Sequence, residues 1–264
     1  MVIDAHTHIG YWKSLIKTEN ILLSSMQEHN IDYAVFSIDA SEYLDDSLTN
    51  RIVLKKSMIE LNTIALDFAK KHKNLFLLLW IKPSREHSPK WIEALNTFIQ
   101  TNINYIHGLK VHPWTSRIRM DDPRLVPFIE LAKKYNLPIL VHTAKDKYSD
   151  ISILAKVAKK YPSVKFVAAH MQLLSDNAEA LKYIKEIDNL YGDTAWVNID
   201  ATKKAIKLGL EDKIIFGSDN PIDKEKTYDE DIYQDYLKNK KKIKRSVLAK
   251  IMYKNAIDVY KLKI

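Results

Sequence analysis

Short apolar runs alternate along this chain with longer segments in which apolar residues recur every three or four positions. A short, nearly continuous apolar run is typical of a strand that is covered on both faces, as in a parallel sheet. The longer segments have the periodicity of amphipathic helices. The short runs predict eight strands, at residues 2–5, 33–38, 75–81, 106–111, 138–142, 165–170, 195–199 and 213–219.

The segments between these runs predict helices at residues 21–29, 48–72, 89–101, 123–135, 151–161, 177–190 and 202–208, with a mostly helical remainder from about residue 228. Eight strand–helix units in a chain of 264 residues match an α/β fold of the (β/α)8 TIM-barrel type. The competing architecture is a doubly wound open sheet, but no glycine-rich phosphate loop follows any predicted strand. Since no Pro-, Gly- or Ser-rich linker interrupts the pattern, we expect a single domain over residues 1–264.

Composition narrows the class of protein. A hydrophobic content of 46% with 28% charged residues is that of a globular protein with a full core. The chain has no cysteine, which excludes disulfides, thiolate metal sites and cysteine nucleophiles. No apolar stretch approaches the roughly 18 residues of a membrane span, and polar residues interrupt the apolar N-terminus that a signal peptide would need. We therefore expect a cytoplasmic protein with no membrane partner.

The net charge of +8 raises the question of a nucleic-acid partner. Lysines are spread over many predicted helical surfaces, and the basic run at residues 238–245 precedes the final helix. Such runs are more often solvated surface than binding sites, so this pattern argues against nucleic acid as the main partner. The expected partner is a small-molecule substrate. For the oligomeric state, a homodimer is the alternative to a monomer.

Polar side chains that can bind metals stand at the carboxyl ends of the predicted strands. His6 and His8 follow the first strand, and side chains at positions i and i+2 of a strand point to the same side. Further candidates at later strand ends are Lys110, His112, His142, His170 and Asp219. In a barrel these ends converge on one mouth, where active sites are built. The placement predicts a metal site there, because a scatter of ordinary histidines would not follow strand ends.

Several motifs resemble those of a known superfamily. They are Asp-Ala-His-Thr-His at residues 4–8, Gly-Leu-Lys-Val-His-Pro at 108–113, a lone histidine after the fifth and sixth strands, Gly-Ser-Asp-Asn-Pro at 217–221 and Asn-Ala-Ile-Asp-Val-Tyr at 255–260. In this order they are similar to the amidohydrolase superfamily. The likeness is to its amidohydrolase-related metal-dependent hydrolases, whose relatives include aminocarboxymuconate semialdehyde decarboxylase. The resemblance covers essentially the whole chain.

The resemblance implies a catalytic metal and roles for the residues around it. The metal ligands would be His6, His8, His142 and Asp219, which leave a position open for water whose pKa the metal lowers. By the same likeness, Asp219 also takes the proton from that water, and His170 orients the water or polarises the substrate. We expect one divalent ion, Zn²⁺ with Mn²⁺ as the alternative. A second metal would require carboxylation of Lys110, since binuclear members bridge their metals at this place.

Substrate-binding candidates lie near the expected mouth. Lys110 and His112 share a strand parity, so both can point inward, while Trp80, Trp114 and Arg117 fall near bordering loops. Cationic groups with aromatic walls suit a small organic acid or lactone.

The functional hypothesis is a metal-dependent hydrolase that cleaves a lactone, ester or amide bond of a carboxylate-bearing molecule. The alternative is a decarboxylase of a small organic acid with the same site. A third, weaker hypothesis is a nuclease like the TatD-type enzymes, which however carry a glutamate where this chain has Lys110.

Overall fold

The computed structural model describes residues 1–12, 15–40, 56–222, 224–240 and 242–264. One sheet contains eight parallel strands, which are β1 (Ile3–Trp12), β3 (Tyr33–Ala40), β4 (Leu75–Trp80), β5 (Ile106–Val111), β6 (Ile139–Ala144), β7 (Phe166–Leu173), β8 (Leu190–Asp193) and β9 (Ile214–Ile215). A further strand, β2 (Leu15–Lys17), pairs antiparallel with the end of β1. Each parallel strand pairs with the next one along the chain, as a singly wound barrel requires.

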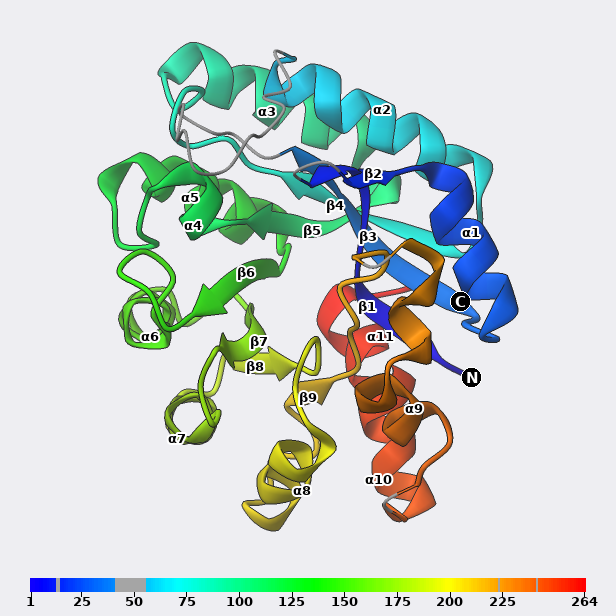
Figure 1. Cartoon of the computed structure of the whole chain (residues 1–264). Coiled ribbons are helices and arrows are strands. Elements are labelled where there is room, and N and C mark those ends of the chain that lie inside the picture. The colour runs from blue at the N-terminus through cyan, green and yellow to red at the C-terminus, as the bar shows by residue number, and fades with distance from the viewer. Residues whose placement is uncertain (13–14, 41–55, 223, 241) are drawn as a thin grey trace.

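The sheet curls until its first and last strands meet. The amide of Ala5 donates to the carbonyl of Phe216 at 2.9 Å, and the amide of Asp219 donates to the carbonyl of His6 at 2.7 Å. The amide of His8 donates to the carbonyl of Asn220 at 2.8 Å in the same seam. The curled sheet with helices outside it is visible in Figure 1. The prediction of a (β/α)8 barrel is confirmed.

Most helices link successive parallel strands along the outside of the sheet, and the last three follow the final strand (Figure 1). They are α1 (Glu19–Glu28), α2 (Met58–Lys71), α3 (Pro89–Asn102), α4 (Pro113–Ser116), α5 (Val126–Tyr135), α6 (Ile151–Lys160), α7 (Ala178–Glu186), α8 (Ile199–Lys207), α9 (Asp231–Leu237), α10 (Arg245–Ala249) and α11 (Asn255–Tyr260). Short 3-10 turns occur at η1 (Ile103–Tyr105), η2 (Pro123–Leu125) and η3 (Lys224–Asp229), and η4 (Lys250–Lys254) is a π-helical turn between α10 and α11.

Local chemistry explains where several helices begin. Ser57 and Glu60 form a capping box that starts α2, with each side chain bonded to the other's backbone amide. Pro89 occupies the first turn of α3, where its missing N–H costs nothing. The first part of the helix predicted at residues 48–72 lies outside the described residues.

Two apolar layers make up the core. The larger layer fills the space between the sheet and the surrounding helices. The smaller one fills the inside of the barrel near the amino ends of the strands, where it combines inward-facing strand residues such as Ile3, Val35 and Leu140 with Val259 and Tyr260 of α11. We call this smaller cluster the barrel floor. It leaves the carboxyl ends of the strands as the open end of the interior.

The seventh predicted strand was wrong. Residues 195–198 form a turn and a short link into α8, which begins at Ile199, and the strand, β8, lies at Leu190–Asp193. The turn imitates a strand because Ala195 and Val197 are both fully buried. The true strand was missed because it is short and contains Gly192, and only its first residue, Leu190, fell within a predicted element, the helix at 177–190. Gly192 is needed there since an added Cβ would lie 2.5 Å from the side chain of Met171.

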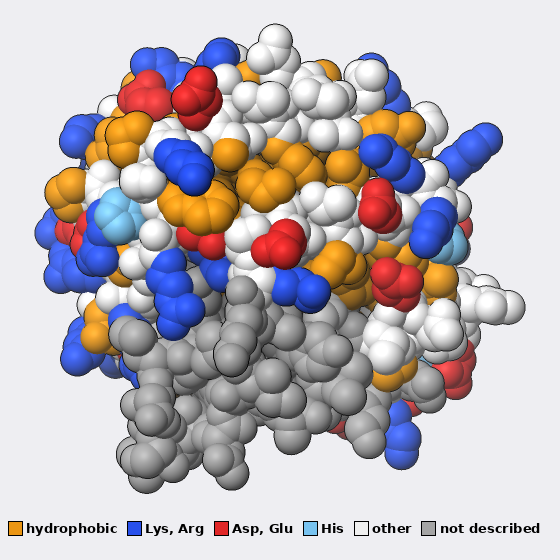
Figure 2. Space-filling model, turned by 90° about the horizontal axis from the view of Figure 1, so that it is seen from above, with side chains coloured by type: hydrophobic (Ala, Val, Ile, Leu, Met, Phe, Trp, Pro, Cys, Tyr) orange, Lys and Arg blue, Asp and Glu red, His pale blue; other side chains and the backbone are white. Residues whose placement is uncertain are grey.

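The surface carries both signs of charge. Figure 2, which looks down on the molecule from above the view of Figure 1, shows Lys and Arg side chains interspersed with Asp and Glu around a band of hydrophobic side chains. Among the helices described, none has both the length and the apolar content to cross a membrane.

Candidate active site

The carboxyl ends of the strands enclose a cavity of about 380 Å³. Its walls come from five of the parallel strands and from the loops that follow β8 and β9. The lining residues are His6, His8, Asp39, Lys110, His112, His142, His170, Leu173, Trp196, Asp219 and Ile222. The seven residues predicted from strand ends therefore share one cavity, although they are spread over more than 200 positions of the sequence.

Three of these residues bring donor atoms to a common point. Nε2 of His8 lies 3.0 Å from Oδ1 of Asp219, and Nε2 of His6 lies 3.4 Å from the same oxygen. The three donor atoms are all within 4.8 Å of one another, which is the spacing of ligands around a single ion. Two imidazoles and one carboxylate suit Zn²⁺ or Mn²⁺ in kind, so the residues fit the metal that the sequence motifs imply.

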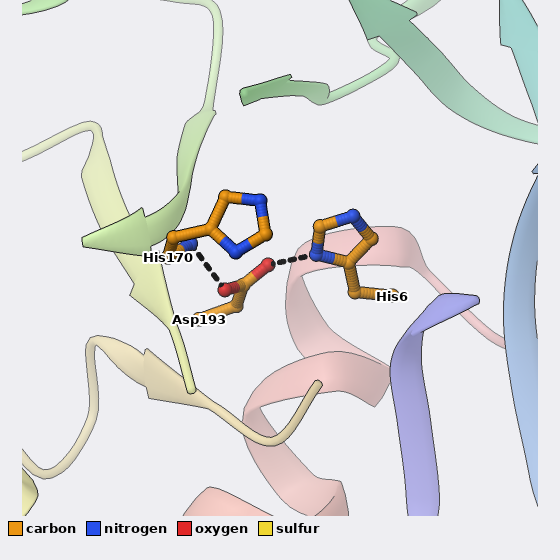
Figure 3. A group of neighbouring side chains, drawn as sticks. All are labelled: His6, His170 and Asp193. Carbon is orange, nitrogen blue, oxygen red and sulfur yellow. Dashed lines mark hydrogen bonds and ion pairs between the residues drawn. The ribbon is translucent and has the colours of Figure 1, made fainter. Parts of the chain in front are cut away.

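The far nitrogen of each of these imidazoles has its own partner. Nδ1 of His6 lies 2.8 Å from Oδ2 of Asp193, and Nδ1 of His8 lies 3.0 Å from the hydroxyl of Ser37. Partners of this kind orient a ligating histidine, because they hold the ring so that its other nitrogen faces the metal. Figure 3 shows Asp193 between the His6 ring and the backbone of His170.

A second group of histidines also lines the cavity. Nε2 of His170 lies 3.1 Å from Nδ1 of His142, and Nδ1 of His170 lies 3.1 Å from the carbonyl of Ala195. The ring of His112 stacks on that of His142 with centroids 3.9 Å apart. His142 lines the cavity but is not in the tight donor group of His6, His8 and Asp219. Its role as a metal ligand stays a prediction.

The electrostatics of the cavity suit metal binding. Burial, with the nearby charge of Lys110, lowers the pKa of His6, His112 and His142 well below that of a free imidazole. Burial by itself would raise the pKa of Asp219, but the hydrogen bond and charge of His8 together with His6 hold it well below its ordinary value. At neutral pH the site therefore contains neutral imidazoles beside an ionised carboxylate, which are the protonation states that metal ligands need.

Lys110 is the cation at the centre of the site. Its side chain is 1% exposed, and its Nζ lies 2.9 Å from Nε2 of His6. An ammonium group can only donate hydrogen bonds, so it is directed at the lone pair of His6 and at the space of the cavity.

The backbone is left-handed at three residues of the cavity wall. His170, Trp196 and Asp219 have φ angles of 67°, 56° and 67°. Each such residue costs of order 1–3 kcal/mol and needs surrounding contacts to persist. Oδ1 of Asp193 accepts from the amide of His170 at 2.7 Å, and the carbonyl of His6 accepts from the amide of Asp219 at 2.7 Å. The same contacts that orient the side chains thus also hold the backbone that carries them.

Sequence reasoning missed three polar residues of the site. Asp39 lines the cavity at the end of β3 and could have been found by the same strand-end rule. Trp196 donates from Nε1 to Oδ2 of Asp219 at 3.3 Å, but its position in a turn gave no such signal. Asp193 ends β8, and it escaped notice because the seventh strand was predicted too late in the chain.

The predicted substrate residues divide into two groups. Lys110 and His112 line the cavity, but Trp80, Trp114 and Arg117 are absent from its described lining. The rings of Trp80 and Trp114 lie 6.2 and 6.5 Å from the ring of His112. The guanidinium of Arg117 lies over the Trp114 ring at 5.1 Å. The contact of these three residues with substrate stays a prediction.

The sequence of this chain matches the family model described as Amidohydrolase over residues 3–262. This protein belongs to the amidohydrolase family. The match spans nearly the whole barrel, including the strand ends that carry the cavity residues. A comparison of the sequence with curated proteins found no match.

Solved structures with the same fold are distant in sequence. 5-Carboxyvanillate decarboxylase from Novosphingobium aromaticivorans, complexed with manganese and 4-hydroxy-3-methoxy-5-nitrobenzoic acid, has a TM-score of 0.74 at 13% identity, over 99% of this chain and 96% of its own. 2,6-Dihydroxybenzoate decarboxylase, complexed with 2,6-dihydroxybenzoate, has a TM-score of 0.71 at 15% identity over 99% of both chains. A probable 2-pyrone-4,6-dicarboxylic acid hydrolase from Acinetobacter baumannii, with citric acid bound, has a TM-score of 0.66 at 14% identity over 98% of this chain and 99% of its own.

Proposed function

We propose that this amidohydrolase is a metal-dependent hydrolase that cleaves a lactone, ester or amide bond in a small, carboxylate-bearing molecule. The observation that carries the proposal is the convergence of His6, His8 and Asp219 on one point inside a cavity of about 380 Å³. A cavity of this size suits a small organic molecule rather than a nucleic-acid strand.

The roles of the residues follow from their positions. His6, His8 and Asp219 would hold the metal, with His142 as the further ligand from β6. Zn²⁺ or Mn²⁺ at this point would lower the pKa of a water molecule towards neutrality and polarise the scissile carbonyl. Asp219 is ionised, and the indole N–H of Trp196 donates to its Oδ2 and orients the carboxylate. Asp219 can therefore accept the proton of the attacking water.

Three further residues of the cavity would act on the substrate or on the water. The carbonyl of Ala195 accepts from Nδ1 of His170, so Nε2 of the neutral ring carries the lone pair, and through it His170 would accept a hydrogen bond from the attacking water and orient it. Lys110 is a buried cation next to the metal ligands and would pair with a carboxylate of the substrate. His112 lines the same wall and would contribute a further polar contact.

A second candidate function is metal-dependent decarboxylation of a small organic acid. Two of the similar structures are named as decarboxylases of aromatic acids, one of them with manganese bound. The same donors, with Lys110 beside them, could orient a carboxylate for loss of carbon dioxide. A hydrolase is among the similar structures as well, so the two reactions need a direct test.

The first experiment measures metal content. Protein purified without a tag and incubated with Zn²⁺ or Mn²⁺ should contain about one ion per chain by elemental analysis, as expected of a mononuclear site. His8→Ala should lose the ion. Two ions per chain would instead indicate carboxylation of Lys110, and a wild-type protein that takes up no metal would contradict the proposal.

The second experiment separates the two reactions. The metal-loaded protein is given a panel of lactones, esters and amides that carry a carboxylate, and a panel of aromatic and unsaturated acids. Formation of the hydrolysed acid product without carbon dioxide, followed by chromatography, indicates hydrolysis, and carbon dioxide release indicates the alternative. Asp219→Asn should abolish either activity. Asp67→Asn, the same change at an exposed position of α2, is the matched control and should leave activity unchanged.

A further inference from the structure

Asp193 lies behind the metal ligands rather than in the cavity. It ends β8, its side chain is 1% exposed, and it is absent from the described cavity lining. Both of its oxygens have partners. Oδ2 lies 2.8 Å from Nδ1 of His6, and Oδ1 accepts from the amides of His170 at 2.7 Å and Ala195 at 3.1 Å (Figure 3).

The polarity of these contacts determines which nitrogen of His6 carries hydrogen. A backbone amide can only donate, so Oδ1 of Asp193 must be an acceptor. In the carboxylate form Oδ2 is also an acceptor, and it therefore requires a hydrogen on Nδ1 of His6. Nε2 of His6 then carries a lone pair and faces Asp219 and His8. The ammonium group of Lys110, 2.9 Å from Nε2, is consistent with that lone pair because it too can only donate.

We propose that Asp193 is a positioning residue that holds His6 in the Nδ1–H tautomer and, with its other oxygen, holds the left-handed backbone of His170. One carboxylate thus sets the orientation of two histidines on different strands. The proposal deepens the proposed function, since it rests on His6 being a metal ligand through Nε2.

A direct metal site at Asp193 is the competing interpretation. His6, His170 and Asp193 also have donor atoms within 4.8 Å of one another. Ligation through Nδ1 of His6, the ring nitrogen 2.8 Å from Oδ2 of Asp193, would require that nitrogen to give up its hydrogen. The three hydrogen bonds to Asp193 are instead those of a carboxylate that supports a ligand.

His8 offers a contrast within the same site. Its Nδ1 faces the hydroxyl of Ser37, which can donate or accept and so imposes no tautomer. Removal of Ser37 should therefore affect the metal site less than a change at Asp193.

The test is Asp193→Asn, which keeps the shape of the side chain. Its amide oxygen must face the backbone amides of His170 and Ala195, because the reverse orientation would place N–H groups against N–H groups. The new NH₂ then donates to Nδ1 of His6 and moves the ring hydrogen to Nε2, where the lone pair for the metal is lost. We expect the affinity for Zn²⁺ or Mn²⁺ to fall roughly 10–100-fold, with the circular dichroism spectrum unchanged, while Ser37→Ala stays within about 3-fold of wild type.

The tautomer itself is measured in the metal-free protein by ¹⁵N NMR of the imidazoles, with His6 assigned by the signals that disappear in His6→Gln. The wild type should show Nδ1–H, and Asp193→Asn should show Nε2–H. A wild-type His6 in the Nε2–H form would overturn the proposal even if the variant does not fold. Loss of metal in Asp193→Asn with full binding in Asp219→Asn would also overturn it, because the ion would then lie at the Asp193 group.

These measurements separate the failure of the inference from that of the proposed function. A wild-type protein that binds no metal contradicts the proposed function, whereas the NMR result still decides the tautomer that Asp193 imposes.

Discussion

The two ends of the barrel interior differ although the same strands build both. Towards their amino ends the strands point Ile3, Val35 and Leu140 inward, and α11 closes the space with Val259 and Tyr260. Towards their carboxyl ends they point histidines, a lysine and aspartates into a cavity. The floor is apolar and closely packed. The mouth is polar and buried, and its backbone adopts left-handed φ angles at three wall residues.

The comparison shows how stability and function are divided along each strand. Apolar burial at the floor stabilises the fold by roughly 25 cal/mol per Å² of surface. The mouth gathers groups whose pKa values are shifted because they are buried near one another, as is common at functional sites. Changes at the mouth should therefore reduce activity with little effect on stability, and changes at the floor should do the reverse.

The largest expected effect is at the mouth. Asp219→Asn removes the proposed base and changes a proposed metal ligand, so kcat/KM should fall by about 10²–10⁴-fold, the usual contribution of a general base. The melting temperature should change little, since no apolar contact is lost. Steady-state kinetics on the substrate found in the panel, with a thermal melt alongside, checks both. A variant that keeps its activity would remove Asp219 from the mechanism.

At the floor, Tyr260→Ala should lower the free energy of unfolding by about 3–5 kcal/mol, as large-to-small core changes do. The hydroxyl of Tyr260 is buried without a hydrogen-bond partner among the described residues. Tyr260→Phe, the matched control, should accordingly be neutral or stabilising. Chemical denaturation measures both variants. Equal losses of stability in the two would show that the hydroxyl, rather than the ring, holds the floor together.

Gly192 lies on β8, next to Met171 and Ile184 of the layer between the sheet and the helices. Gly192→Ala should cost about 1–3 kcal/mol, the usual range for overpacking, because the added Cβ would lie 2.5 Å from Met171. A urea melt tests this. If the strand were at residues 195–199 instead, Gly192 would lie in a loop and the change would be harmless, so a neutral result would contradict the placement of β8.

The smallest effect concerns a histidine at the floor side of β5. Burial is the main cause that lowers the pKa of His107, although its bond to the carbonyl of Tyr260 at 3.2 Å opposes the shift. Below its ordinary pKa of about 6.5 the unfolded chain binds the proton more readily than the folded one. The stability that neutral His107 supports is therefore present above that pH and lost as the pH falls.

His107→Gln should reduce the loss of stability between about pH 7 and pH 5, since the ordinary histidine pKa lies within this window. The measurement is the free energy of unfolding of variant and wild type at a series of pH values. Parallel curves for the two proteins would show that His107 is protonated equally in both states.

Much of the fold follows from local patterns. Seven of the eight predicted strands overlap parallel strands of the barrel, because each is an apolar run long enough to be distinctive. The exception is β8, which is short and contains Gly192, while the buried turn with Ala195 and Val197 has a more strand-like pattern. Strand propensity cannot distinguish these two segments. Only the packing of Met171 against β8 shows which of them belongs to the sheet.

The sequence by itself determined the barrel and the residue types at its strand ends. Apolar periodicity and the position of His6, His8 and Asp219 after strands are properties of neighbouring residues. Only the tertiary structure decided that Asp193, 187 positions from His6, supports that ring. The direction of a hydrogen bond depends on which donors and acceptors come together in space. No local sequence pattern indicates that β1, β7 and β8 bring their residues to one carboxylate.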